Sequence, residues 1–194
     1  MSAMLAQAGA AGQAIVVTAP SLNTSTATLT AYSRTAGTWT AAFGPWPARI
    51  GNPGFAPAGE KREGDERTPS GAYGFEFMFG VDADPGVKFP YFQVTPSIVW
   101  VDDPTSPLYN QWVDRSQQAV TASVEQMYQP LAYRHGAVIA YNSARTPNLG
   151  SAIFLHASTG SATAGCVSLP VDLLIQVLKW LDPAQNPRIV MGVG

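Results

Sequence analysis

The chain has little charge, one cysteine and no long apolar run. Asp, Glu, Lys and Arg together make up 12% of its 194 residues, and the formal net charge is −2. This balance argues against binding nucleic acid through bulk charge, which requires a basic face. A single cysteine excludes an intramolecular disulfide and a zinc site built from several cysteines. No stretch approaches the roughly 18 to 20 consecutive apolar residues of a transmembrane helix.

Glycine and proline, in contrast, are abundant, with 18 and 16 copies. Such a chain contains many turns and short elements, which favours a mainly β fold. The length suits one domain with a substantial core. We therefore predict a single domain over residues 14–194, preceded by a flexible leader at 1–13. The leader is rich in Ala and Gly and lacks the basic and apolar regions of an intact signal peptide.

The hydrophobic pattern predicts several strands and one clear helix. The helix follows Pro170, has apolar residues at helical spacing, and ends at Asp182–Pro183. A second, weaker helix is expected at 115–129. Alternating or β-branched segments predict strands at 14–18, at two segments between 21 and 43 joined near 35–37, and at 74–80, 137–142, 151–156 and 188–192.

The single cysteine, Cys166, follows a small flexible segment and directly precedes the predicted helix. A helix N-terminus favours a thiolate, and a free thiol with a pKa near 8.5 is only a few per cent ionised at neutral pH without help. His156 ends a strand ten residues earlier, and the intervening turn can return the chain beside it. Gly165 allows close approach of the backbone to a carbonyl, so the Gly165 and Cys166 N–H groups are candidate oxyanion donors.

These residues alone leave other interpretations open. A lone cysteine is more often a small buried apolar residue than a nucleophile. The other histidine, His135, is best read as structural or solvent-facing. The charge run at 61–67 is typical of a solvated loop, with a role of Asp65 and Thr68 in turn structure as the next possibility.

Several blocks in order resemble the YkuD-type L,D-transpeptidase family. His156 and Thr163-Ala164-Gly165-Cys166-Val167 resemble the family's active-site signature, a strand histidine followed by Ser/Thr-x-Gly-Cys and an aliphatic residue. Residues 59–71 resemble its G-D-x-x-T-P-x-G segment. Tyr141–Asn142 and residues 150–156 fit a branch with a short loop between histidine and cysteine. The resemblance covers roughly residues 45–192.

The chain departs from this family pattern at three positions near the signature. The family often has Gly after the histidine, His or Arg before Gly-Cys, and Arg or Asn two residues after the cysteine. Here these positions hold Ala157, Ala164 and Ser168. The reacting pair is retained, whereas polar groups that would anchor a substrate are reduced.

The resemblance implies a mainly β catalytic domain, barrel-like or sandwich-like, with one or two flanking helices. The implied reaction is two-step acyl transfer between peptidoglycan stem peptides, with Cys166 as nucleophile and His156 as its base. A second stem's amine then resolves the thioester and forms a 3–3 cross-link. A backbone carbonyl near Ala157 is expected to orient His156, and no metal or organic cofactor is needed.

The same resemblance assigns further site residues and partners. Gly165, Thr163 and Ala164 are expected to bind the oxyanion or substrate, and Tyr141 and Asn142 are expected to line the cleft. Carbapenems are expected to inhibit by acylating Cys166, and the protein is expected to act outside the cytoplasmic membrane. Two alternatives remain: an L,D-carboxypeptidase or other cell-wall amide hydrolase using the same pair, and a non-catalytic wall-binding module. The intact pair argues against the module.

Overall fold

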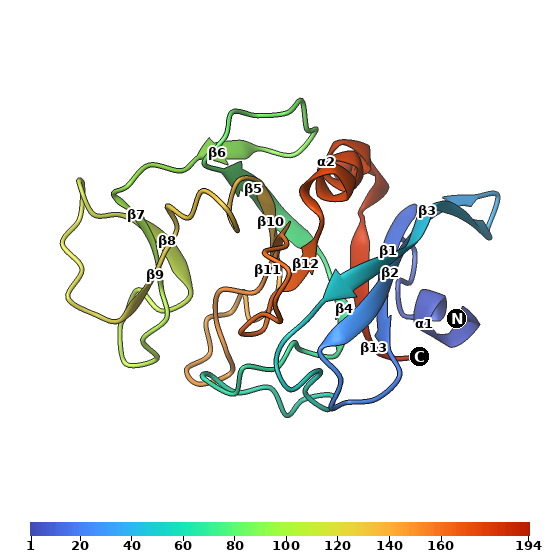
Figure 1. Ribbon diagram of the computed structural model, residues 1–194, viewed down its shortest axis with the longest axis horizontal. Helices are drawn as coiled ribbons and strands as arrows, with labels where there is room; N and C mark the ends of the chain where they lie inside the picture. Colours follow the sequence, from blue (N-terminus) through green and yellow to red (C-terminus); the bar gives the residue numbers. More distant parts are fainter.

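Two β-sheets and two short α-helices make up the fold of the computed structural model, which describes residues 1–194 (Figure 1). The large sheet is curled and has the strand order β4-β13-β1-β2-β3-β12-β11-β10-β5-β6. Its strands are β1 (Gln13–Ala19), β2 (Thr26–Thr35), β3 (Thr38–Arg49), β4 (Gly71–Tyr73), β5 (Phe75–Gly80), β6 (Tyr91–Gln93), β10 (Gly136–Ile139), β11 (Phe154–Ala157), β12 (Val167–Leu169) and β13 (Arg188–Val193). The small sheet, ordered β8-β7-β9, comprises β7 (Ile98–Val101), β8 (Gln111–Asp114) and β9 (Val124–Gln126).

The main core lies on the face of the large sheet that helix α2 (Val171–Trp180) covers. Leu174, Val177 and Leu178 of α2 are fully buried there. They join Leu155 of β11 and Val167 of β12 in one cluster of 22 buried residues. Burying each large apolar side chain contributes roughly 1.5–3 kcal/mol, so this face fixes β11 and β12 firmly.

A second, aromatic cluster lies on the opposite face of β5, β10 and β11. It contains Phe79 and Phe154 from the large sheet and Trp100 from β7, with Trp100 and Phe154 in edge contact at a centroid distance of 5.0 Å. The small sheet, at the left of Figure 1, is thereby attached to the large one. The free cysteine, Cys166, belongs to this second cluster.

The predicted β-rich class and most of the predicted elements are confirmed. The strands expected at 14–18, 74–80 and 188–192 correspond to β1, β5 and β13, and the helix expected after Pro170 is α2. The turn near residues 35–37 joins β2 to β3. None of the helices has the length and hydropathy needed to cross a membrane.

The helix predicted at 115–129 is wrong. This segment contains β9, which pairs antiparallel with β7 and places Glu125 opposite Trp100. Val120, Thr121 and Val124 are β-branched, and such side chains lose rotamer freedom in a helix but pack well on a sheet. Pairing with β7 therefore outweighs the weak helical pattern.

Residues 1–13, expected to form a flexible leader, instead pack on the domain. Helix α1 (Ser2–Ala6) contacts β1 and β13, and its Met4 and Leu5 are buried. They cluster with Val16 and Val190, which point away from the main core. Because α1 covers this outer face, β1 is buried on both sides, and its Gln13 is already the first residue of the strand.

Candidate active site

The register of β11 and β12 brings His156 and Cys166 to one face of the sheet. The strands run parallel, with Leu155 beside Val167 and His156 beside Ser168. Side chains alternate between faces, so His156, Ser168 and Cys166 lie opposite the face that Leu155 and Val167 give to the main core. Cys166 is therefore a diagonal neighbour of His156 across the two strands, two residues before Ser168.

Both side chains line a cavity of about 300 Å³. One wall is the loop that joins β11 to β12, residues 158–166. Further lining residues come from β9 and the segment after it. The full lining comprises Glu125, Gln129, Ala132, Tyr133, Ser151, Ala152, His156, Thr159, Ser161, Ala162, Thr163, Ala164, Cys166 and Ser168.

The Cys166 thiol is held by backbone groups and is neutral in the free protein. Its Sγ accepts a hydrogen bond from the Phe154 N–H at 3.3 Å and donates one to the Ala152 carbonyl at 3.2 Å. Only 8% of the residue is exposed. Burial raises the pKa of the thiol to about 12, against the lowering effect of the Phe154 N–H.

The expected assistance from a helix N-terminus is absent. Strand β12 and Pro170 separate Cys166 from Val171, the first residue of α2. The dipole effect fades within the first turn of a helix, so it does not reach the sulfur. The prediction that this helix end ionises Cys166 was therefore wrong, and formation of the thiolate would require a neighbouring base.

A backbone contact holds His156 in the tautomer that such a base requires. Its Nδ1 lies 2.8 Å from the Ala157 carbonyl oxygen. A carbonyl only accepts, so Nδ1 carries the proton and the lone pair of neutral His156 is on Nε2. Burial lowers the pKa of His156, which keeps the ring neutral at pH 7. The predicted orienting carbonyl is thus that of Ala157, and the ring also makes edge contact with Tyr133 at a centroid distance of 5.3 Å.

The turn before Cys166 is fixed by Thr163. Its Oγ1 donates to the Cys166 carbonyl at 2.6 Å and accepts from the Gly165 N–H at 3.2 Å. Gly165 has φ +139°, a conformation that other residues rarely adopt. The Gly165 N–H is therefore already engaged, whereas the Cys166 N–H has no acceptor in the protein. Of the two expected oxyanion donors, Cys166 is the free one; Thr163 and Ala164 both line the cavity.

Thr68, within the predicted G-D-x-x-T-P-x-G segment, holds Cys166 from the other side. Its buried Oγ1 donates to the Cys166 carbonyl at 3.3 Å and accepts from the Gly51 N–H at 2.9 Å. From the sequence, Thr68 was given at most a role in local turn structure, since it lies 98 positions from Cys166 in the chain. Thr68 therefore links this loop to the cysteine backbone.

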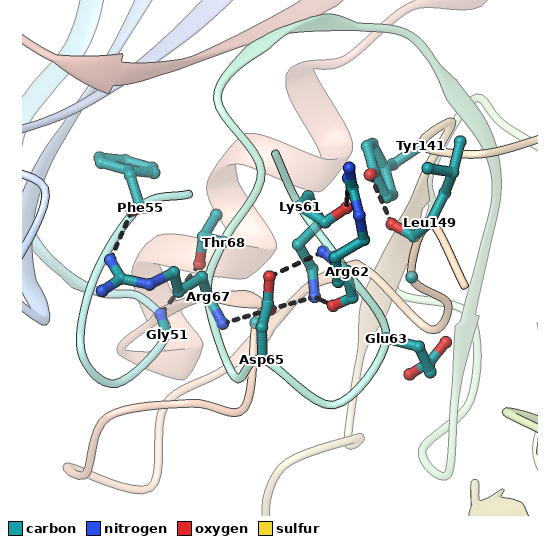
Figure 2. Close-up of polar contacts among 12 residues, drawn as sticks. Gly51, Phe55, Lys61, Arg62, Glu63, Asp65, Arg67, Thr68, Tyr141 and Leu149 are labelled. Carbon is teal, nitrogen blue, oxygen red and sulfur yellow. Dashed lines mark hydrogen bonds and ion pairs between the residues drawn. The ribbon is translucent and has the colours of Figure 1, made fainter. Parts of the chain in front are cut away.

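The loop that carries Thr68 is organised by Asp65, as Figure 2 shows. Asp65 accepts from Lys61 Nζ at 2.5 Å, from the Arg62 N–H at 2.7 Å and from the Arg67 N–H at 2.9 Å. Burial alone would raise the pKa of Asp65, but the bonds from Lys61 and the two backbone groups lower it. Lys61 is 5% exposed, so the interpretation of this charge run as a solvated loop was wrong for Lys61.

Tyr141 and Asn142, expected to line the cleft, lie outside the cavity. The Tyr141 hydroxyl donates to the Leu149 carbonyl at 2.6 Å, a contact drawn in Figure 2. Asn142 Nδ2 donates to the Gly150 carbonyl at 2.9 Å. Both side chains hold the loop that leads into β11, and they shape the site only through this loop.

Glu125, Ser151 and Ser168 are among the cavity residues that were not predicted as site residues from the sequence. Glu125 lies in the segment predicted as a helix, so its position was wrongly assigned. The Ser151 and Ser168 hydroxyls are buried and have no hydrogen-bond partner in the protein. Ser168 was noted only as a departure from the family pattern. Its place beside His156 depends on the parallel pairing of β11 with β12, which the sequence did not reveal.

The chemistry available here is that of a thiol nucleophile with a histidine base. No group of three or more His, Cys, Asp or Glu side chains is placed to hold a metal ion. A neutral imidazole with a fixed tautomer, a thiol on the same strand face and a free backbone N–H are the parts that acyl transfer through a thioester requires. This set of groups is the one that Cys–His acyl-transfer domains use.

The chain belongs to the YkuD family of L,D-transpeptidase catalytic domains, whose pattern matches residues 14–190. Among solved structures, it is similar to the helical cell shape determining protein Pgp2 from Campylobacter jejuni, with 15% identity and a TM-score of 0.44. The similarity covers 99% of this chain and 55% of the Pgp2 chain. No curated protein sequence gave a significant match.

Proposed function

We propose that the protein is a cysteine-dependent L,D-transpeptidase that forms 3–3 cross-links between peptidoglycan stem peptides outside the cytoplasmic membrane. The observation that carries this proposal is the cavity that Cys166 lines together with His156, a histidine whose Nδ1 is bonded to the Ala157 carbonyl. That bond leaves Nε2 free to accept a proton. Family membership supports the choice of L,D-peptides of the cell wall as substrates.

In the first half-reaction, Cys166 attacks the L,D-peptide carbonyl of a donor stem. His156 Nε2 takes the thiol proton as the bond between Sγ and the carbonyl carbon forms. The Cys166 N–H stabilises the resulting oxyanion. The carbon–nitrogen bond then breaks, the imidazolium returns its proton to the departing D-alanine amine, and a thioester remains.

In the second half-reaction, the amine of another stem attacks the thioester carbonyl. The carbon–sulfur bond breaks, and the proton lost by the amine passes through His156 to Cys166 Sγ. This regenerates the neutral thiol that burial favours. Water in place of the amine would give the tripeptide and make the protein an L,D-carboxypeptidase.

Incubation with a disaccharide tetrapeptide, followed by mass analysis, separates these outcomes. We expect cross-linked dimer and free D-alanine from the wild type and neither from Cys166→Ala. His156→Ala should slow the reaction by about 10² to 10⁴-fold, the usual contribution of a general base. The matched control is His135→Gln, since His135 lies outside the cavity and bonds Tyr91 at 2.9 Å.

Three results would contradict the proposal. Free tripeptide without dimer would identify a hydrolase that uses the same pair. No product of either kind, from a folded wild-type protein, would indicate a binding module. A normal rate for Cys166→Ala would place the nucleophile elsewhere.

A further inference from the structure

The cavity around Cys166 has an unusual charge pattern. Of its 14 lining residues, Glu125 is the only acidic one, and there is no Lys or Arg. With His156 neutral, Glu125 carries the single formal charge among the residues that line the cavity. Such a cavity repels a substrate carboxylate and attracts a protonated amine.

The Glu125 carboxylate is held by one of its two oxygens. Oε1 accepts from the Tyr133 hydroxyl at 2.9 Å and from Gln129 Nε2 at 2.8 Å. Oε2 has no hydrogen-bond partner in the protein. The same Tyr133 ring contacts His156 at a centroid distance of 5.3 Å, so the Tyr133 side chain links Glu125 to His156.

Two buried hydroxyls provide a second, independent indication of a polar ligand. Ser168 is 1% exposed and Ser151 is 7% exposed, and neither Oγ has a partner in the protein. Buried polar atoms in folded proteins nearly always make hydrogen bonds. Since both residues line the cavity, a bound group with neutral polar atoms would satisfy them.

We propose that Glu125 Oε2 binds the protonated side-chain amine of a stem peptide in the Cys166 cavity. The Ser151 and Ser168 hydroxyls form hydrogen bonds with neutral polar atoms of the same peptide. The site therefore selects a stem-peptide side chain that bears an amine and no free carboxylate. This inference rests on the proposed function and names a specificity determinant of the same cavity. An ammonium bound at Oε2 releases one proton to solvent water to become the attacking amine, and the second proton leaves through His156 as the amide bond to the thioester carbonyl carbon forms.

Binding to Cys166→Ala tests the inference without catalysis. The two probes are a stem tripeptide with a free side-chain amine and the same tripeptide acetylated on that amine. We expect the free-amine form to bind at least tenfold more tightly, as measured by titration calorimetry. Adding Glu125→Gln should reduce this preference to less than threefold, because the amide keeps the bonds to Tyr133 and Gln129 but loses the charge.

The matched control is Glu60→Gln, which removes one negative charge from an exposed residue outside the cavity and should keep the full preference. An unchanged preference in the Glu125→Gln background overturns the inference. Binding of neither peptide to Cys166→Ala overturns it as well. Failure of the proposed function is a separate result, the absence of dimer from wild-type protein.

Kinetics of Glu125→Gln in the otherwise wild-type protein identify which stem supplies the amine. If it is the acceptor, the half-saturating acceptor concentration rises about tenfold or more while the rate of acyl-enzyme formation is unchanged. If it is the donor, the KM for acylation rises instead. Unchanged values for both steps would overturn the inference.

Discussion

The free protein should hold Cys166 as a neutral thiol across the physiological range. Burial raises its pKa to about 12, whereas an ordinary thiol has a pKa near 8.5. At pH 7.5 the ordinary thiol is about 10% ionised, and a group with the higher pKa is about 0.003% ionised. The thiolate is the reactive form, so alkylation of Cys166 should be slower than that of a free thiol by on the order of 10³-fold.

Iodoacetamide labelling followed by intact mass measures this directly, because Cys166 is the only cysteine. The rate should keep rising with pH beyond 10, with no plateau near 8.5. Protein unfolded in urea is the control and should titrate as an ordinary thiol. A folded-state midpoint at or below about 8.5 would refute the view that substrate must enter before His156 removes the proton.

Three further predictions concern the supports of the site and its inhibition. Asp65→Asn should lower the free energy of unfolding by about 3 kcal/mol at pH 7, because it leaves Lys61 buried without its partner. Since the folded-state pKa of Asp65 is lowered, the wild type itself loses this stabilisation as the pH falls below about 4. Urea unfolding should therefore show a smaller difference in unfolding free energy between wild type and Asp65→Asn at pH 3 than at pH 7. The same difference at both pH values would contradict this prediction. Thr68→Val should lower the free energy of unfolding by about 1–3 kcal/mol in the same measurement and should slow acylation, because the Cys166 carbonyl and the Gly51 N–H each lose a hydrogen-bond partner. Unchanged stability would contradict this prediction. A carbapenem should add its mass to the peptide containing Cys166 and nothing to Cys166→Ala, and an adduct on the variant would identify another nucleophile.

Local patterns in the sequence were sufficient for much of the scaffold. Helix α2 follows from apolar spacing after Pro170, and β1 and β13 follow from β-branched runs. The signature around Cys166 and the strand carrying His156 predicted that the two residues act together, and the structure places both in the lining of one cavity. These features depend on residues close together in the chain.

Features that depend on distant contacts were not predictable in this way. The bond from Thr68 to the Cys166 carbonyl and the attachment of α1 to β1 and β13 arise only when the sheet forms. Glu125 was hidden because the weak helical pattern at 115–129 is overridden by pairing of β9 with β7. The assumed effect of the helix dipole on Cys166 failed because β12 occupies the space between them.

The most direct test of the central claim is the mass of the covalent intermediate. Wild-type protein mixed with a stem tetrapeptide and quenched in acid should carry the tripeptide acyl group on the peptide that contains Cys166, with one equivalent of D-alanine released. His156→Ala should accumulate the same adduct far more slowly, and Cys166→Ala should carry none. An acyl group on any other residue, or acylation of His156→Ala at the wild-type rate, would contradict the account.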